Sequence, residues 1–288
     1  MNAKKALMAI LLVLVSGCTS FEGVRELAKN DNTNKTYYES GELKEEWNYK
    51  DGKADGTAKF YYKSGKLMGE RNYKEGKPEG VGRDYYESGE LLLEWNYKDG
   101  TLEGISREYY QSGKLKAVFN YKNGELDGRN TSYFEDGKLM GEAYYQNGNL
   151  ENVVKSFHES GALKEEFNYR GNKLEGIART YYESGALESE FNYQDNKMEG
   201  IGKIYYESGA LKEASNYKNG MLDGVAKLYY ESGKVKAEIN YQEDAEEGIA
   251  TYYHENERVQ ARYDYTKGFV NRVEIYDEDG KLIDEKNF

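Results

Sequence analysis

The sequence predicts an all-β fold, an elongated repeat array built as an antiparallel β-hairpin meander. Three observations predict it: a strict 24-residue period, alternation of apolar and polar residues with period two, and turn dipeptides at fixed places in each repeat. We count about ten repeats and about twenty short strands over residues 32–288. Because each repeat contacts mainly its neighbours, we expect no single compact core.

Two glycine series and one tyrosine series carry the period. In the first glycine series and in the tyrosine series, successive members stand 24 residues apart without a gap, whereas the second glycine series has one gap, at Asn152. A period of this length is typical of stacked supersecondary units. The members are Gly41, Gly65, Gly89, Gly113, Gly137, Gly161, Gly185, Gly209 and Gly233; Gly56, Gly80, Gly104, Gly128, Gly176, Gly200, Gly224 and Gly248; and Tyr49, Tyr73, Tyr97, Tyr121, Tyr145, Tyr169, Tyr193, Tyr217, Tyr241 and Tyr265.

Each repeat is predicted to hold two strands. The stretch 42–49 alternates with period two, which places Leu43, Glu45, Trp47 and Tyr49 on one face. The stretch 104–110 is β-branched and aromatic at its key positions, as strands are. We expect aromatic pairs on one face and lysine–glutamate pairs on the other to hold such a thin ribbon together.

Two kinds of turn connect these strands. Residues 39–41 read Glu-Ser-Gly, where glycine adopts a positive φ at little cost. Residues 51–52 read Asp-Gly and residues 123–124 read Asn-Gly, the strongest short-range hairpin signal. Both kinds favour antiparallel neighbours.

The N-terminal residues read as a targeting segment. Residues 1–17 contain two lysines and an apolar run of ten residues, which is the pattern of an export signal and too short for a bilayer-spanning helix of about 20 residues. The ending Val15-Ser16-Gly17-Cys18 resembles the bacterial lipobox, which implies lipidation of Cys18 and a membrane partner through that anchor. With Thr19 after the cysteine, the resemblance implies the outer membrane, and 18–31 becomes a tether. An ordinary secretory signal that carries a cysteine is the alternative.

Composition and motifs argue against several functions. The net charge of −12 repels nucleic acid, so we expect no nucleic-acid partner. The stretch 200–203 begins like a phosphate loop but lacks the third glycine of that motif, so we expect no nucleotide. His158 and His254 lie four repeats apart and fill an aromatic stacking position, so they cannot share a metal. Serines such as Ser40 recur in the turns with the 24-residue period, and no histidine recurs with them. We therefore predict no catalytic residue and no cofactor, and we expect that the protein is not an enzyme.

An acidic residue precedes each member of the second glycine series. We expect these carboxylates to cap turns and aid solubility, with calcium binding as the weaker alternative. Equivalent residues of adjacent repeats would stand about 9.6 Å apart, which is too far for one ion with ligands at about 2.4 Å. The residues are Asp55, Glu79, Glu103, Asp127, Glu175, Glu199, Asp223 and Glu247.

Repeats of the form Y-Y-E-S-G-x-L-K-x-E-x-N-Y-K-[DN]-G-K-x-[DE]-G resemble the variant MORN repeats of bacterial proteins, a class that includes the YwqK-type antitoxin family. The resemblance covers residues 32–276. It implies a non-enzymatic envelope scaffold that binds a protein partner. Two alternatives stay open: an immunity or antitoxin protein that neutralises a partner toxin, and a glycan-binding array on the cell surface.

The predicted binding surface is a row of aromatic residues, here called the aromatic stripe. An exposed apolar patch of several hundred Å² usually marks a contact site. The alternative is that these rings pack on one another and are structural. The aromatic stripe consists of Trp47, Tyr49, Trp95, Tyr97, Phe119, Tyr121, Phe167, Tyr169, Phe191 and Tyr193.

Overall fold

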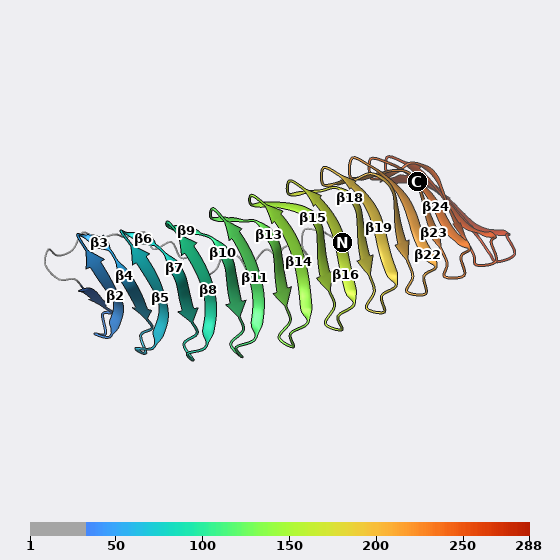
Figure 1. Cartoon of the computed structure of the whole chain (residues 1–288). Helices are drawn as coiled ribbons and strands as arrows, with labels where there is room; N and C mark the ends of the chain where they lie inside the picture. The colour runs from blue at the N-terminus through green and yellow to red at the C-terminus, as the bar shows by residue number, and fades with distance from the viewer. Residues whose placement is uncertain (1–32) are drawn as a thin grey trace. The chain divides into compact units, whose positions relative to one another are not determined.

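The computed structural model describes residues 33–288, which form strands and turns without a helix (Figure 1). The predicted all-β hairpin meander is therefore confirmed. The predicted signal segment 1–17, Cys18 and the tether 18–31 lie outside the described residues. The described strands fall into two compact blocks: a first block that ends at Gly148, and a second block, Asn149–Phe288.

Each full repeat contains a strand of eight residues, a strand of two residues and a strand of six residues; in β15 and β23 the last two are merged. The first block contains β1 (Thr33–Tyr37), β2 (Leu43–Lys50), β3 (Lys53–Ala54), β4 (Gly56–Tyr61), β5 (Leu67–Lys74), β6 (Lys77–Pro78), β7 (Gly80–Tyr85), β8 (Leu91–Lys98), β9 (Thr101–Leu102), β10 (Gly104–Tyr109), β11 (Leu115–Lys122), β12 (Glu125–Leu126), β13 (Gly128–Tyr133) and β14 (Leu139–Gln146). The second block contains β15 (Asn149–Phe157), β16 (Leu163–Arg170), β17 (Lys173–Leu174), β18 (Gly176–Tyr181), β19 (Leu187–Gln194), β20 (Lys197–Met198), β21 (Gly200–Tyr205), β22 (Leu211–Lys218), β23 (Met221–Tyr229), β24 (Val235–Gln242), β25 (Ala245–Glu246), β26 (Gly248–Tyr253), β27 (Val259–Thr266), β28 (Phe269–Tyr276) and β29 (Leu282–Asn287).

The strand count corrects our estimate of about twenty, because residues 33–288 form 29 strands and seven of these have only two residues. The short strands come from an interruption of the second strand of the repeat. Strands β3 and β4 both pair antiparallel with β2, and only Asp55 separates them. At this point Gly56 has a φ of 105°, which breaks the regular ladder as a bulge does. The second glycine series thus marks a bulge in the repeats that carry one of its members, with Asn152, at a φ of 61°, in the gap.

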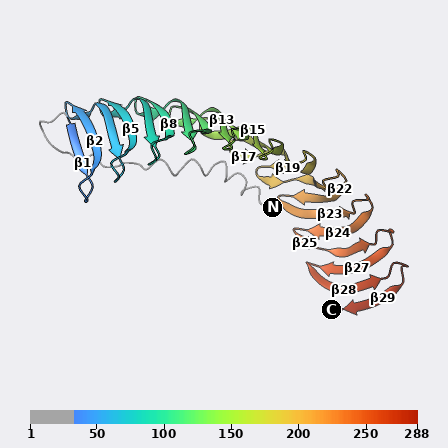
Figure 2. The ribbon, with the colours of Figure 1, turned by 90° about the horizontal axis from the view of Figure 1, so that it is seen from below.

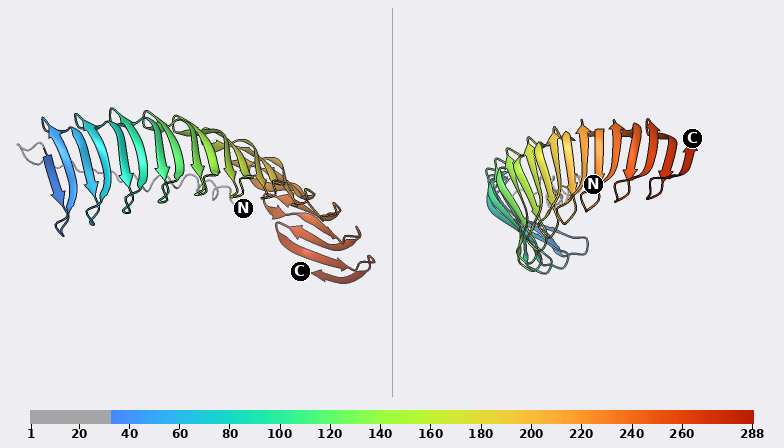
Figure 3. Two further views of the ribbon diagram at one scale, coloured as in Figure 1. Left: turned by 60° about the horizontal axis from the view of Figure 1, so that its bottom comes forward. Right: turned by 90° about the vertical axis from the view of Figure 1, so that its right-hand side faces the viewer.

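Both predicted turns are present, and in each block the two kinds lie at opposite ends of the strands (Figure 3). At the first turn, the N–H of Gly41 donates to the carbonyl of Tyr38 at 2.9 Å. At the second turn, Asp51 and Gly52 have φ values of 51° and 77°. Two successive positive φ values define the type I′ turn, whose twist suits a two-residue hairpin.

In each block the strands form a single layer (Figure 2). One face of that layer, here called the buried face, carries the apolar core. In the second block, Ala237, Ile239 and Ala250 form a buried cluster against which Tyr241 and Tyr252 pack. Small residues recur where neighbouring aromatic rings need room. The buried apolar side chains of this face are Ala58, Phe60, Trp95, Ala117, Ala143, Leu150, Val154, Phe167, Tyr169, Leu174, Ala178, Ala226, Ala237, Ile239, Ala250 and Ala261.

The opposite face, here called the open face, carries rows of cross-strand ion pairs. Arg179 lies 2.8 Å from Glu190, and Lys227 lies 2.7 Å from Glu238. Their strands place these residues directly opposite each other, as the predicted lysine–glutamate pairing requires. Each such exposed pair stabilises the sheet by only about 0–1 kcal/mol.

Candidate functional site

The aromatic stripe lies on the buried face, and its rings contact their neighbours. Trp95, Phe167 and Tyr169 are buried, and the other seven members are half-buried. The Trp47 ring lies 5.1 Å from the ring of Tyr73 and meets the ring of Phe60 edge-on at 5.5 Å. Such contacts supply the packing that a sheet without a second layer needs. Docking on the aromatic stripe stays a prediction.

Arg71 occupies the place in its repeat that Trp47 and Trp95 occupy in theirs. Its guanidinium carbon lies 4.9 Å from the ring centroid of Phe60 and 5.2 Å from that of Trp95, within cation–π range. Asp84 lies 3.3 Å from the same guanidinium. Burial raises the pKa of the Asp84 carboxyl, and the charge of Arg71 opposes that shift. On the buried face, the Arg71 guanidinium is thus surrounded by one carboxylate and two aromatic rings.

The second tyrosine of each Tyr-Tyr pair joins its repeat to the next. Its hydroxyl donates to a backbone carbonyl 23 residues further along, at 2.7–2.8 Å. We call these contacts the hydroxyl ladder; at part-buried sites, hydrogen bonds of this kind contribute about 1 kcal/mol each. The donors are Tyr38, Tyr62, Tyr86, Tyr110, Tyr182, Tyr206 and Tyr230.

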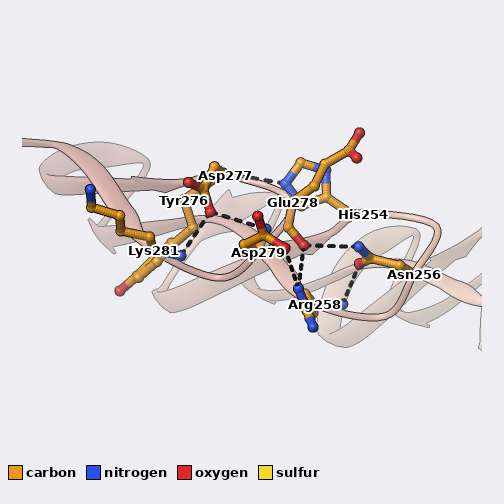
Figure 4. Close-up of polar contacts among 8 residues, drawn as sticks. All are labelled: His254, Asn256, Arg258, Tyr276, Asp277, Glu278, Asp279 and Lys281. Carbon is orange, nitrogen blue, oxygen red and sulfur yellow. Dashed lines mark hydrogen bonds and ion pairs between the residues drawn. The ribbon is translucent and has the colours of Figure 1, made fainter.

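The two histidines belong to the same ladder, which corrects our interpretation of them as stacking residues. His254 Nε2 lies 3.2 Å from the carbonyl of Tyr276, and His158 makes the equivalent contact at 3.0 Å (Figure 4). Beside His254, Asn256 and Arg258 each donate to the carbonyl of Glu278 at 2.9 Å. An imidazole N–H thus replaces a phenol O–H as the donor.

The acidic residues that precede members of the second glycine series cap turns, as predicted, but the capped turn belongs to the next repeat. Glu199 accepts a hydrogen bond from the backbone N–H of Asn219 at 2.7 Å. Seven of the eight predicted residues make this contact, and Glu151 makes it with Gly171. Within residues 33–288, no group of three or more histidine, cysteine, aspartate or glutamate side chains is placed to hold a metal ion.

A second row of apolar residues, which our reading of the sequence missed, lies exposed on the open face. These residues directly follow members of the second glycine series. The recurrence of an apolar residue at this place every 24 residues was the signal in the sequence that could have revealed the row. We call them the aliphatic ladder. They are Val81 (37% exposed), Ile105 (45%), Ile177 (40%), Ile201 (58%), Val225 (38%) and Ile249 (57%).

The aliphatic ladder is exposed because its cross-strand neighbours cannot cover it. Ile201 faces Asn216, and Val225 faces Asn240. The side chain of Asn216 turns to the backbone and donates to the carbonyl of Val225 at 2.7 Å, so it does not shield Ile201. Scattered exposed apolar residues are normal, whereas a row at the same place in four consecutive repeats of the second block is a candidate contact surface.

Comparison with known protein families identifies the repeat. The family described as MORN repeat variant matches nine segments, which start 24 residues apart and together cover more than half of the chain: 30–51, 54–75, 78–99, 102–123, 126–147, 150–170, 174–195, 198–219 and 222–243. The chain belongs to the MORN repeat variant family. Its repeats continue beyond the last match, because β26 to β28 follow the same hairpin pattern.

Other comparisons add little to this assignment. No curated protein matches the chain. Among solved structures, the chain is similar to "Crystal Structure of TcdB2-TccC3-Cdc42", with 11% identity, a TM-score of 0.19 and coverage of 88% of this chain and 17% of that one. It is also similar to "Structure of Photorhabdus luminescens Tc holotoxin pore, Mutation TccC3-D651A", with 13% identity, a TM-score of 0.19 and coverage of 84% and 15%. The chain therefore spans less than a fifth of either protein. Residues 33–288 contain no helix that could span a membrane.

Proposed function

We propose that this MORN-repeat protein is a non-enzymatic scaffold that binds a protein partner along the open face of its sheet. The observation that carries the proposal is the aliphatic ladder, which leaves Ile201 and Ile249 more than half exposed at the same place in their repeats. Burying the exposed half of an isoleucine contributes on the order of 1 kcal/mol, so four ladder positions supply a useful share of a binding energy.

The surroundings of the ladder support a protein partner. On the same face lie paired charges such as Arg179–Glu190 and Lys227–Glu238, which give an apolar row a polar border. Interfaces between proteins combine an apolar centre with a polar rim in this way. The acidic net charge of −12 makes nucleic acid a poor partner for the same surface.

We further propose that the scaffold is held on the bacterial cell envelope through lipidated Cys18, with Thr19 directing it to the outer membrane. The support is the sequence pattern of residues 1–19 alone. Mass spectrometry of the mature N-terminal peptide checks this. Acyl groups on Cys18 are expected, and an unmodified peptide that begins upstream of Cys18, or at another residue, contradicts the anchor.

The test of partner binding is cross-linking in living host cells, followed by purification and mass spectrometry. The ladder variant carries Ile201→Thr and Ile249→Thr, because Thr57 already occupies that place in its own repeat. The comparison variant carries Trp47→Ser on the aromatic stripe. We expect one dominant captured protein that is lost in the ladder variant and kept in the comparison variant. Loss only with Trp47→Ser would move the site to the aromatic stripe, and no captured protein in the wild type would refute the scaffold. The identity of the captured protein separates a scaffold from an immunity role.

A further inference from the structure

Strand β29 (Leu282–Asn287) has one edge that is paired and one that is not. It pairs antiparallel with β28, and along its other edge no strand of the described part of the chain pairs with it. All six residues of β29 are exposed. Leu282 is 43% exposed, Ile283 61%, and Phe288, which follows the strand, 71%. An unpaired edge that carries apolar side chains is a template for another strand.

The backbone decides which residues of β29 can bond to an added strand. The N–H of Phe288 donates to the carbonyl of Asn271 at 2.9 Å, so the backbone groups at position 288 face β28. Alternate residues of a strand direct these groups to opposite sides. Those of Glu285 and Asn287 therefore face away from β28, whereas Ile283 is the extra residue of the bulge opposite Ile275 and Tyr276, where the alternation breaks. The N–H of Glu285 donates to Asp284 Oδ1 at 2.9 Å, a bond that an added strand would replace. An antiparallel copy of the same strand can form hydrogen-bonded pairs through Glu285 and Asn287.

Three symmetric registers with extensive overlap are possible, centred on Asp284, Glu285 or Lys286. Centring on Asp284 places that carboxylate against its own copy, and centring on Lys286 places two ammonium groups together. Centring on Glu285 places Asp284 against Lys286 of the second copy twice. This favourable pair then occupies non-hydrogen-bonded positions, where side chains approach most closely.

The remaining like-charge contact in this register is compensated in part. On the two-fold axis Glu285 faces Glu285 of the second copy. Within the same chain, the guanidinium of Arg272 lies 3.0 Å from Glu285 and 2.6 Å from Glu274, so it offsets part of that charge. We propose that β29 pairs with β29 of a second copy of this chain, antiparallel and centred on Glu285, to form a symmetric dimer.

A disulfide measures the register directly. The variants are built on Cys18→Ser, because Cys18 is the only cysteine in the chain. In the proposed register the Cα atoms of the two copies of position 285 lie about 5.5 Å apart, within the range that a disulfide spans. The two copies of position 284 lie diagonally, about 7–8 Å apart. Mild oxidation is expected to give a covalent dimer of Glu285→Cys at least about tenfold faster than of Asp284→Cys. No covalent dimer of Glu285→Cys, or equal rates, would overturn the proposal.

Charge exchange tests the same pairing without a cross-link. We expect Asp284→Lys and Lys286→Asp each to raise the dimer dissociation constant about tenfold or more, measured by sedimentation velocity on a chain with no tag after Phe288. An equal mixture of the two variants should dimerise again, because each then supplies the charge that the other lacks. Recovery in the mixture also shows that both variants fold. A wild-type chain that is monomeric at about 100 µM, or a mixture that stays monomeric, would refute the dimer.

Discussion

The hydroxyl ladder predicts that single oxygen atoms stabilise the junctions between repeats. In Tyr206→Phe the phenol that donates to the carbonyl of Tyr229 at 2.8 Å is lost, and only one atom is removed. A hydrogen bond of this kind contributes about 0.5–1.5 kcal/mol to the free energy of unfolding, so a loss of about 1 kcal/mol is expected. Tyr182 and Tyr230 make the same contact in the neighbouring repeats. Because these sites have separate partners, the triple variant should lose about 3 kcal/mol.

The matched control is Tyr205→Phe. Tyr205 is a half-buried neighbour of Tyr206, and its hydroxyl has no hydrogen-bond partner among residues 33–288. This change should alter the free energy of unfolding by less than about 0.5 kcal/mol. Equilibrium urea unfolding, followed by circular dichroism and by tyrosine fluorescence, provides the values if the two signals coincide. A triple variant as stable as the wild type, or a control that loses as much as Tyr206→Phe, would refute the reasoning.

Three further predictions concern the buried face and the turns. Gly202→Ala should lower the free energy of unfolding by about 1–3 kcal/mol, although alanine occupies the same place in other repeats, because an added Cβ would lie 2.4 Å from Phe191. Equal or higher stability in urea unfolding would contradict this. Burial raises the pKa of Asp84, so the stability of the wild type relative to Asp84→Asn should be greatest below about pH 3.9 and fall as the pH rises through the raised pKa. Urea unfolding at several pH values checks the direction, and a relative stability that increases with pH would contradict it. Glu199→Ala removes the cap on the N–H of Asn219 and should cost about 1 kcal/mol, seen as faster hydrogen exchange in that turn; unchanged exchange there would exclude a capping role.

Much of the fold could be predicted because it depends on local signals. The type I′ turn at Asp51-Gly52 follows from residues that accept positive φ, and the alternation from Leu43 to Tyr49 defines a strand with two unlike faces. The family assignment agrees with the 24-residue period that both signals share. The bulge at Gly56 was missed because a glycine before a strand reads equally well as part of a turn.

The candidate surfaces were harder to predict, because they depend on contacts between repeats. Alternation shows that Ile201 and Gly202 lie on opposite faces, yet in a sheet of one layer it does not show which face is covered. The side chain of Asn216 bonds to the backbone and leaves Ile201 exposed, which only the register reveals. The role of His254 was misread for the same reason, since its partner carbonyl at Tyr276 lies in the next repeat.

The measurement that tests the scaffold most directly is site-specific photo-cross-linking in host cells. A photoreactive p-azidophenylalanine replaces Ile201 on the open face in one strain and Tyr193 on the buried face in another. Mass spectrometry then identifies any protein attached to the chain. The account predicts one dominant adduct from position 201 and none from position 193. An adduct from position 193 alone, or none from either position, would contradict a protein-binding surface on the open face.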